Sequence, residues 1–338
     1  MTCGFKMAIC GESCITGLGD GLGLWMESIE KRCEVPRMID PELFRDHVDP
    51  VNSGVRELNR VQKISAIAFS RAIINAGISV LELPQKRIAI LFGNTYGVEE
   101  FKTGFYRVFS TSAHDLTSPV LFPFTTCNSI SAYLSIMYGI EGINITYSSG
   151  ATSASEALLA ANDILSLGKA DTVVVIGESF FYDSLDVEFV RCGFKNECCA
   201  AIVLMGEKDA KKSGKNIHAY IENIEHGFLG KKTIYDVIPP KAPACRILNH
   251  GMSFGTDANG EDGGAVSNQG GIRLISLERI FGNTFSASGV LGLILGEFWL
   301  KYEKPALLGE RPSNYEEVFF MNIDSCGGYV GTTISGKK

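Results

Sequence analysis

Short apolar runs rich in β-branched residues alternate along the chain with longer segments in which apolar residues recur at helical spacing. This alternation is typical of α/β proteins, in which helices cover both faces of a central sheet. The runs predict more strands than a single nucleotide-binding unit contains. The expected strands cover residues 6–14, 87–94, 143–148, 172–178, 198–206, 217–226, 246–250, 273–276 and 319–324.

The helical pattern predicts helices over residues 58–76, 127–138, 154–167 and 286–302. Gly77, Gly139 and Gly168 follow the first three, as expected of glycines that end helices. We expect the polar segment 208–215 to be a hairpin tip and the glycine-rich segment 251–271 to be a surface or active-site loop.

A similar order of strands and helices recurs on either side of residue 230. This recurrence predicts two similar halves of βαβαβ type that share a core. We expect the first half to comprise residues 1–230 and the second residues 231–338.

The composition and charge of the chain exclude several classes of function. The 338 residues are 45% hydrophobic and 20% charged, as in folded globular proteins, and 31 basic against 38 acidic side chains give a net charge of −7. The chain therefore lacks the positive field that nucleic-acid binding needs. No apolar run approaches the roughly 18 residues that cross a bilayer, and Glu12 interrupts the first apolar run before it could form a signal-peptide core. We expect a cytoplasmic protein.

The ten cysteines are scattered and include no C-x-x-C pair, so we expect reduced, buried thiols. The five histidines form no ligand pattern with cysteine or with one another. The acidic segment 257–262 has its glycine at the wrong position for an EF-hand loop, and the glycines of segment 17–23 fit neither a dinucleotide-binding motif nor a P-loop. We expect no metal and no cofactor.

The segment from Gly142 to Ala154 runs from a buried strand through a turn of small residues into a helix. An acyl-transfer enzyme would place a nucleophile at such a turn, because the backbone N–H groups of the helix stabilise an anion there. The residue at the turn is Ala151, which has no nucleophile. The neighbouring hydroxyls of Ser148, Ser149 and Thr152 are explained as turn or capping groups.

Two other candidates remain. Ser253 lies in a G-x-S-x-G pattern, but no helical pattern follows it. His250 ends an apolar run and opens the glycine-rich segment, where α/β proteins place working residues. A purely structural role for His250 stays open.

Taken in order, these segments resemble the β-ketoacyl carrier-protein synthases, the condensing enzymes of fatty acid and polyketide synthesis. The resemblance covers nearly the whole chain, and the spacing from Gly142 to Ala151 agrees with the family without gaps. It implies a thiolase-like α/β fold, with the two halves forming a layered α-β-α-β-α core. The matching segments are Ala8–Gly11 with Gly19 and Trp25, Leu58–Ile78, Ser118–Pro123 with Asn128, Tyr138–Gly142, Lys169–Asp171, Gly177–Ser179, and Gly193 with Glu197–Leu204.

The resemblance also assigns the family's catalytic positions. The nucleophilic cysteine falls on Ala151 and the first histidine on His250, which is retained. The family's lysine falls on Glu278 and its second histidine on Asn283. In the closing motif, Asp324 and Cys326 replace the two phenylalanines, so the gate position is Cys326. Without a thiolate the chain cannot hold a growing acyl group, and we therefore assign no catalytic residue.

A ketosynthase-like chain without the catalytic cysteine resembles the chain-length factors of type II polyketide synthases. This resemblance implies a heterodimer with an active ketosynthase, an acyl carrier protein with a phosphopantetheine-bound polyketide chain as a further partner, and strand 143–148 pairing across the dimer. The implied tunnel and interface residues are Tyr96, Leu121, Phe124, Thr125, Ile145 and Tyr147. Plain core packing is an equal explanation for the aromatic ones.

Two alternatives stay open. One is an acyl-thioester decarboxylase or hydrolase that uses His250 with Ser149 or another nearby hydroxyl. The other is a homodimeric scaffold that has no ketosynthase partner.

Overall fold

The computed structural model describes residues 5–30, 38–40, 42, 59–79, 85–111, 119, 121–180, 182, 196–239, 241–243, 245–250, 266–269, 272–301 and 316–337. Its strands form one 12-stranded sheet with the order β4-β3-β5-β6-β1-β7-β12-β11-β8-β10-β9, and β2 pairs with β1. The strands are β1 (Met7–Thr16), β2 (Gly19–Asp20), β3 (Ile88–Gly93), β4 (Asn144–Tyr147), β5 (Thr172–Ser179), β6 (Cys198–Gly206), β7 (Ala219–Phe228), β8 (Cys245–His250), β9 (Val266–Gln269), β10 (Ile272–Ser276), β11 (Glu317–Ile323) and β12 (Gly328–Gly336).

The helices lie between these strands in the chain. The α-helices are α1 (Leu22–Glu30), α2 (Arg60–Asn75), α3 (Glu99–Thr111), α4 (Ser129–Tyr138), α5 (Ser153–Ser166), α7 (Glu207–Lys212), α8 (Ile234–Val237), α9 (Leu277–Phe281) and α10 (Ser288–Lys301). Short 3-10 helices are η4 (Phe122–Thr125), η5 (Gly150–Thr152) and η7 (Phe285–Ala287). The glycines expected after three helices, Gly77, Gly139 and Gly168, all adopt positive φ, as a helix-ending glycine does.

The strand order repeats. In the first half β1 pairs with β6, which is followed outward by β5, β3 and β4; in the second half β7 pairs with β12, followed by β11, β8 and β10. In each half the first strand in the chain therefore lies next to the last, and the outer three strands are parallel. This repeat confirms the prediction of two similar halves. The repeat begins at β7, before residue 231, and the expected boundary at 230 stays a prediction.

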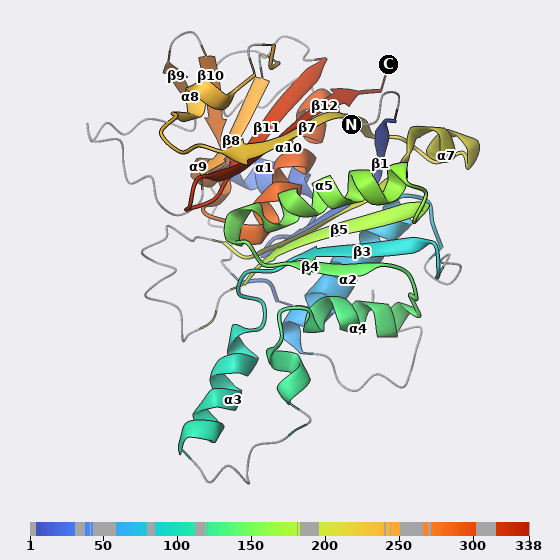
Figure 1. The fold of residues 1–338 in the computed structure, drawn as a ribbon, viewed down its shortest axis with the longest axis vertical. Helices are drawn as coiled ribbons and strands as arrows, with labels where there is room; N and C mark the ends of the chain where they lie inside the picture. Colours follow the sequence, from blue (N-terminus) through green and yellow to red (C-terminus); the bar gives the residue numbers. More distant parts are fainter. Residues whose placement is uncertain are drawn as a thin grey trace.

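The two halves share one core. Helix α10 contacts α5 and strands of both halves, while α5 contacts strands of the first half. A large apolar cluster around them includes Leu158, Val175, Leu291 and Phe320. A second cluster lies on the other face of the first half, where α2 and α4 cover the sheet. In Figure 1, α5 lies above β3 and β5, while α2 and α4 lie below them. A third, smaller cluster lies beneath α8. The result is the expected α-β-α-β-α layering.

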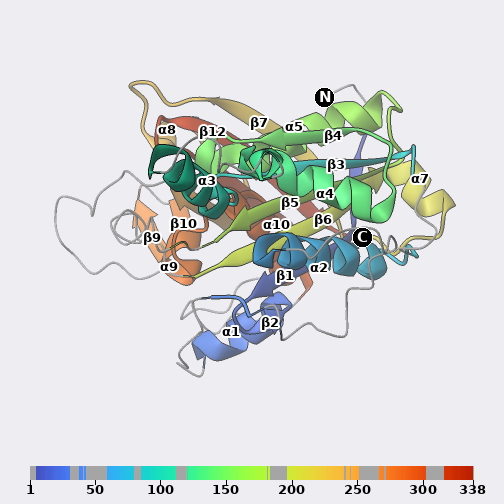
Figure 2. The ribbon, with the colours of Figure 1, turned by 90° about the horizontal axis from the view of Figure 1, so that it is seen from below.

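Helix α3 has no sequence-based prediction and no buried residue. It extends away from the layered body in Figure 1 and is seen nearly end-on from below in Figure 2. The helix does not cover a face of the sheet, because its contacts are mainly with η4. The strands β2, β9 and β12 were also not predicted from the sequence.

Two local predictions are wrong. Segment 208–215 is not a hairpin tip, because its first part belongs to helix α7, and β6 and β7 lie on opposite sides of β1 rather than pairing with each other. The thiols of Cys127 and Cys326 are exposed, whereas the other described cysteines are buried. Part of the glycine-rich segment forms β9, and the rest of it, including Ser253, lies outside the described residues.

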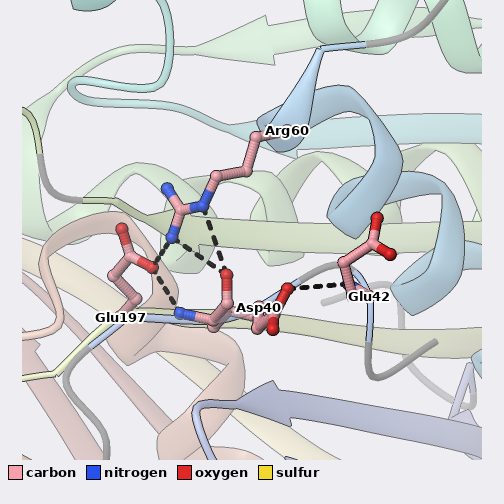
Figure 3. A network of polar contacts seen from close by, with 5 residues as sticks. Asp40, Glu42, Arg60 and Glu197 are labelled. Carbon is pink, nitrogen blue, oxygen red and sulfur yellow. Dashed lines mark hydrogen bonds and ion pairs between the residues drawn. The ribbon is translucent and has the colours of Figure 1, made fainter.

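An ion pair ties the start of α2 to the core. Arg60 pairs with Glu197, whose side chain is fully buried, and both hold the backbone of Ile39. The N–H of Ile39 donates to Glu197 Oε2 at 2.7 Å, and the carbonyl of Ile39 accepts from Arg60 Nε at 3.2 Å. Figure 3 shows the guanidinium of Arg60 and the carboxylate of Glu197 pointing toward each other beside Asp40. A buried carboxylate needs such donors to remain charged.

Candidate functional site

The turn between β4 and α5 carries the position of interest. β4 ends at Tyr147, and the 3-10 helix η5 leads directly into α5, so Ala151 lies at the N-terminal end of a buried helix. Its side chain is 5% exposed. The close approach of α5 depends on Gly93 at the end of β3, because a Cβ there would lie 2.7 Å from the amide nitrogen of Ala154. The turn thus presents a methyl group at the N-terminal end of α5, at the position where the resemblance predicts a nucleophile.

A buried amide holds this turn against the second half. Asn322, at the end of β11 and fully buried, donates from Nδ2 to the carbonyl of Ala151 at 2.6 Å. The same amide lies 3.1 Å from Ser155 Oγ and 3.2 Å from Ser288 Oγ. Asn249 donates to Asn322 Oδ1 at 2.8 Å. The network therefore joins α5, α10, β8 and β11 around Ala151, and a buried network of this kind fixes geometry when its groups are satisfied.

The segment before α10 contacts the same turn, since η5 and η7 pack against each other. Asn283, where the resemblance predicts the family's second histidine, is 2% exposed, and its Oδ1 accepts the N–H of Phe285 at 3.0 Å. Phe285 has φ 39°, the only positive φ of a non-glycine among the described residues. A phenylalanine in this region is strained, and strain of this kind concentrates at functional sites.

Two further predicted positions lie nearby in the second half. His250 is the last residue of β8 and stands in register with Ile323 of β11; its side chain lies outside the described atoms. Glu278 is the second residue of the short helix α9, which contacts β8. Burial raises the pKa of Glu278 to about 7. A glutamate in this environment is a poor substitute for the positive charge of a lysine.

The hydroxyl groups of the turn already have structural roles. Thr152 is 1% exposed and its Oγ1 donates to Glu156 Oε1 at 2.9 Å. Ser153 Oγ donates to the carbonyl of Gly150 and accepts the N–H of Ser149. The Thr152 hydroxyl thus has a structural bond within the turn, although it does not cap the helix, and the expected roles of the Ser148 and Ser149 hydroxyls stay predictions.

Tyr96 reaches the site from the first half. It follows β3 and packs edge-on against Phe285, with ring centroids 5.1 Å apart. Its ring also lies against the apolar cluster under α2 and α4. Tyr96 is thus the one expected tunnel residue that the described structure brings to the Ala151 turn, through its contact with η7.

The other expected tunnel residues lie on the projecting arm of α3 and η4. Phe124 stacks on Phe101 of α3 at 5.5 Å and tilts against Tyr133 of α4 at 5.2 Å. Thr125 Oγ1 donates to the carbonyl of Phe122, and Leu121 is 45% exposed. The arm thus carries exposed apolar and aromatic groups outside the layered body, as an association surface would.

β4 forms one end of the sheet and pairs with β3 alone among the described strands. The carbonyls of Ile143 and Tyr147 accept from β3, so the backbone groups of Asn144 and Thr146 point to the open edge. The side chains of Asn144 and Thr146 bind α4 through Ser131. Ile145 is 38% exposed, while Tyr147 packs against the central core.

The gate position lies in the tight turn between β11 and β12. Asp324 accepts the N–H of Cys326 at 2.7 Å and of Gly328 at 2.9 Å through Oδ1. The carboxylate therefore closes the turn, and the Cys326 thiol is exposed. Aspartate is a favoured residue for this kind of side-chain-to-backbone bonding.

Sequence reasoning did not identify Glu178 as a buried acid near the site. Glu178 is 1% exposed at the end of β5, and its Oε1 accepts the N–H of Gly97 at 3.1 Å. Burial raises its pKa to about 8, although the N–H groups of Gly97 and Thr95 oppose the shift. Its own carbonyl accepts from Ser286 of η7. The only sequence signal was a lone glutamate at the end of an apolar strand.

Comparison with known proteins identifies the architecture. Residues 25–190 match the family model of the beta-ketoacyl synthase N-terminal domain. No curated protein matches the sequence. Within the described residues, no helix is both long enough and apolar enough to span a membrane.

Solved structures match over almost the whole chain. A β-ketoacyl synthase from Burkholderia phymatum STM815 aligns with a TM-score of 0.74 and 15% identity, covering 99% of this chain and 100% of that one. A type II polyketide synthase acyl-carrier protein in complex with its ketosynthase aligns at 0.69 and 14%, covering 98% and 100%. The ishigamide ketosynthase/chain length factor aligns at 0.69 and 13%, covering 99% and 100%. The chain therefore has the thiolase-like fold of the ketosynthases.

Proposed function

We propose that this chain is a non-catalytic, ketosynthase-like subunit that pairs with an active ketosynthase and helps to set polyketide length, as a chain-length factor does. The observation that carries the proposal is the methyl group of Ala151 at a preserved nucleophile turn. A condensing enzyme needs a thiolate there to hold the growing chain and hydrogen-bond donors to stabilise the thioester oxygen. Glu278 and Asn283 occupy two further positions of that machinery.

The hydrogen bonds that hold the Ala151 turn support a role of this region in association with a partner. They argue against a turn that has lost its role and is no longer maintained. Asn322, Asn249 and Ser288 still hold the turn at full burial. A turn without a role would not need a buried polar network, because burying polar groups is more costly than burying apolar ones. We infer that the shape of this region is retained because a partner subunit packs beside it.

The open edge of β4 supports pairing with another ketosynthase-like chain. An edge strand with free backbone donors and an exposed isoleucine is a template for strand addition. The aromatic arm of α3 and η4 lies on the same side of the sheet as α4 and offers further apolar contact (Figure 1). We propose that the partner is an active ketosynthase, to which an acyl carrier protein delivers a phosphopantetheine-bound chain.

A proline at the open edge tests the association. Thr146→Pro removes a backbone N–H that faces away from β3, so the fold should persist while pairing is lost. Thr146→Val is the matched control, because it removes the hydroxyl but keeps that N–H. After co-expression with a ketosynthase that has an intact Cys-His-His set, size-exclusion chromatography should show a heterodimer for the wild type and Thr146→Val, and separate chains for Thr146→Pro. A heterodimer that survives Thr146→Pro would contradict the proposed interface.

A smaller side chain at Tyr96 tests the role in chain length. A packed aromatic ring cannot yield to additional methylene groups without strain, so Tyr96→Ala should admit longer products. Mass spectrometry of the products of the reconstituted complex should show a shift by one or more extension units. Ile74→Ala, at an exposed position of α2 away from the arm, should leave the product unchanged. Condensation or thioester hydrolysis by this chain alone would refute the whole proposal.

A further inference from the structure

Three ionisable side chains from distant parts of the sequence meet outside the Ala151 site. Glu12 comes from β1, His218 from the segment before β7, and Glu297 from α10. Each offers one ligand atom, and these atoms lie within 4.8 Å of one another. His218 Nδ1 lies 3.1 Å from Glu297 Oε1. Two carboxylates and an imidazole are a ligand set that divalent transition metals accept.

A β-bulge aims Glu12 at this cluster. The register of β1 with β6 shifts between Ile9 and Gly11, so the side chains after the bulge exchange faces. Before the shift Met7 and Ile9 face the central core, and after it Cys14 does. Glu12 therefore shares the face of Cys14 and turns toward α10. The N–H of His218 donates to the carbonyl of Ile9 at 2.8 Å, which fixes the imidazole beside the bulge.

His218 and Glu297 are buried, Glu12 is half-buried, and the polar atoms of the three side chains are incompletely paired. The side chains of His218 and Glu297 are 6% and 1% exposed. Glu12 Oε2, His218 Nδ1 and Glu297 Oε2 are buried atoms without a well-aligned hydrogen bond. Leaving several such groups unsatisfied in one place is costly, and a shared cation would satisfy them together.

The ion pair between Lys301 and Glu297 does not prevent the binding of a cation. Lys301 pairs with Glu297, but its own side chain is 38% exposed and can move into solvent. A cation bound between Glu12 and Glu297 would face two carboxylates and the imidazole of His218.

We propose that Glu12, His218 and Glu297 form a binding site for one divalent transition-metal cation of the zinc type. The separation of 3.1 Å between His218 Nδ1 and Glu297 Oε1 matches the edge of about 3.3 Å between two ligands of a tetrahedral zinc ion with ligand bonds of about 2.0 Å. The bound cation links β1 of the first half to α10 of the second and so acts as a structural clamp.

The test is metal binding by the tag-free chain after treatment with EDTA and dialysis. Titration calorimetry with Zn²⁺ should show one site per chain, and Co²⁺ should give the visible absorption bands of a tetrahedral site with N and O ligands. His218→Ala and Glu297→Gln should weaken binding by about 100-fold or more because each removes a ligand. His226→Ala and Glu225→Gln on the adjacent strand β7 are matched controls and should bind like the wild type.

Several results would contradict the proposed metal site. Absence of a stoichiometric site in the wild type, equal binding by the cluster variants, or a near-ultraviolet thiolate-to-cobalt band from the exposed cysteines would overturn the proposal. A variant of a buried cluster residue could unfold, so Lys301→Met provides a second test. The Lys301 side chain is partly exposed, and its replacement is therefore less disruptive to the core. Removal of the competing ammonium group should strengthen Zn²⁺ binding by about tenfold. Unchanged or weaker binding by this variant would also overturn the proposal.

Discussion

At the scale of single residues, Ala151 and Glu178 differ in how far the sequence predicts their role. Ala151 was predicted from spacing, because the turn between a strand and a helix has a recognisable pattern of small residues. Glu178 could not be predicted as a buried acid, since its environment is built by Gly97 and by η7, which lie far from it in the chain. A residue's own type predicts its chemistry, but its burial depends on distant neighbours.

Glu178 makes stability depend on pH. Its pKa of about 8 in the folded chain lies above the ordinary value of 4.5, so between these pH values the folded state holds a proton that the unfolded state has released. Stability from this group is therefore present below pH 4.5 and is lost as the pH rises to 8.

Glu178→Gln should remove this dependence. The amide keeps an acceptor for the N–H of Gly97 and carries no charge, so the variant should match the wild type at pH 5 and exceed its free energy of unfolding at pH 8 by on the order of 3 kcal/mol. Urea denaturation at both pH values measures the difference, with the exposed Glu317→Gln as the control. Parallel pH profiles for Glu178→Gln and the wild type would show that Glu178 is charged in the folded protein.

At the scale of elements, the close contact between α5 and α10 determines how the halves meet. Gly289, in the first turn of α10, lies so near α5 that a Cβ would be 2.6 Å from the amide nitrogen of Ser155. Backbone atoms cannot move aside as a flexible side chain can. The two helices pack closely because this position has no side chain.

Two glycine-to-alanine substitutions should therefore have opposite effects. Gly289→Ala should lower the free energy of unfolding by about 2 kcal/mol, because it forces α10 away from α5. Gly104→Ala in the exposed helix α3, where nothing lies within 4 Å of the added Cβ, should raise it by up to about 1 kcal/mol through better helix propensity. Urea unfolding curves measure both. Equal effects at the two positions would contradict the close packing of α5 on α10.

The elements also show where pattern analysis succeeds. Helices α2, α4, α5 and α10 cover a sheet, so one face of each is apolar and their positions were predicted within a few residues. Helix α3 was missed because its aromatic residues face outward on the arm rather than a sheet. Strand β12 was missed because glycines and threonines interrupt its apolar residues.

At the scale of the whole molecule, the two halves repeat one strand order but do not have separate cores. Trp25 of α1 stacks on Phe281 of α9 with ring centroids 5.0 Å apart, so even the N-terminal helix packs against the second half. Trp299 of α10 lies in the same central cluster. A shared cluster of this kind predicts that the halves unfold together.

Single-tryptophan variants test this cooperativity. Trp299→Phe leaves Trp25 as the fluorescent probe, and Trp25→Phe leaves Trp299. In each variant the urea midpoint from fluorescence should coincide with the midpoint from far-ultraviolet circular dichroism. Separate midpoints within one variant would show that residues 1–230 and 231–338 are independent folding units.

The amino-acid sequence alone determined the alternation of strands and helices, the resemblance to ketosynthases and the missing thiol at position 151, because these features are written in local patterns and residue types. Tertiary structure alone decided that β4 lies at an open edge, that Asn322 holds the Ala151 turn, and that Glu12 meets His218 and Glu297. Each of these depends on contacts between residues far apart in the chain. Strand order and a single β-bulge bring them together, and no local pattern records either.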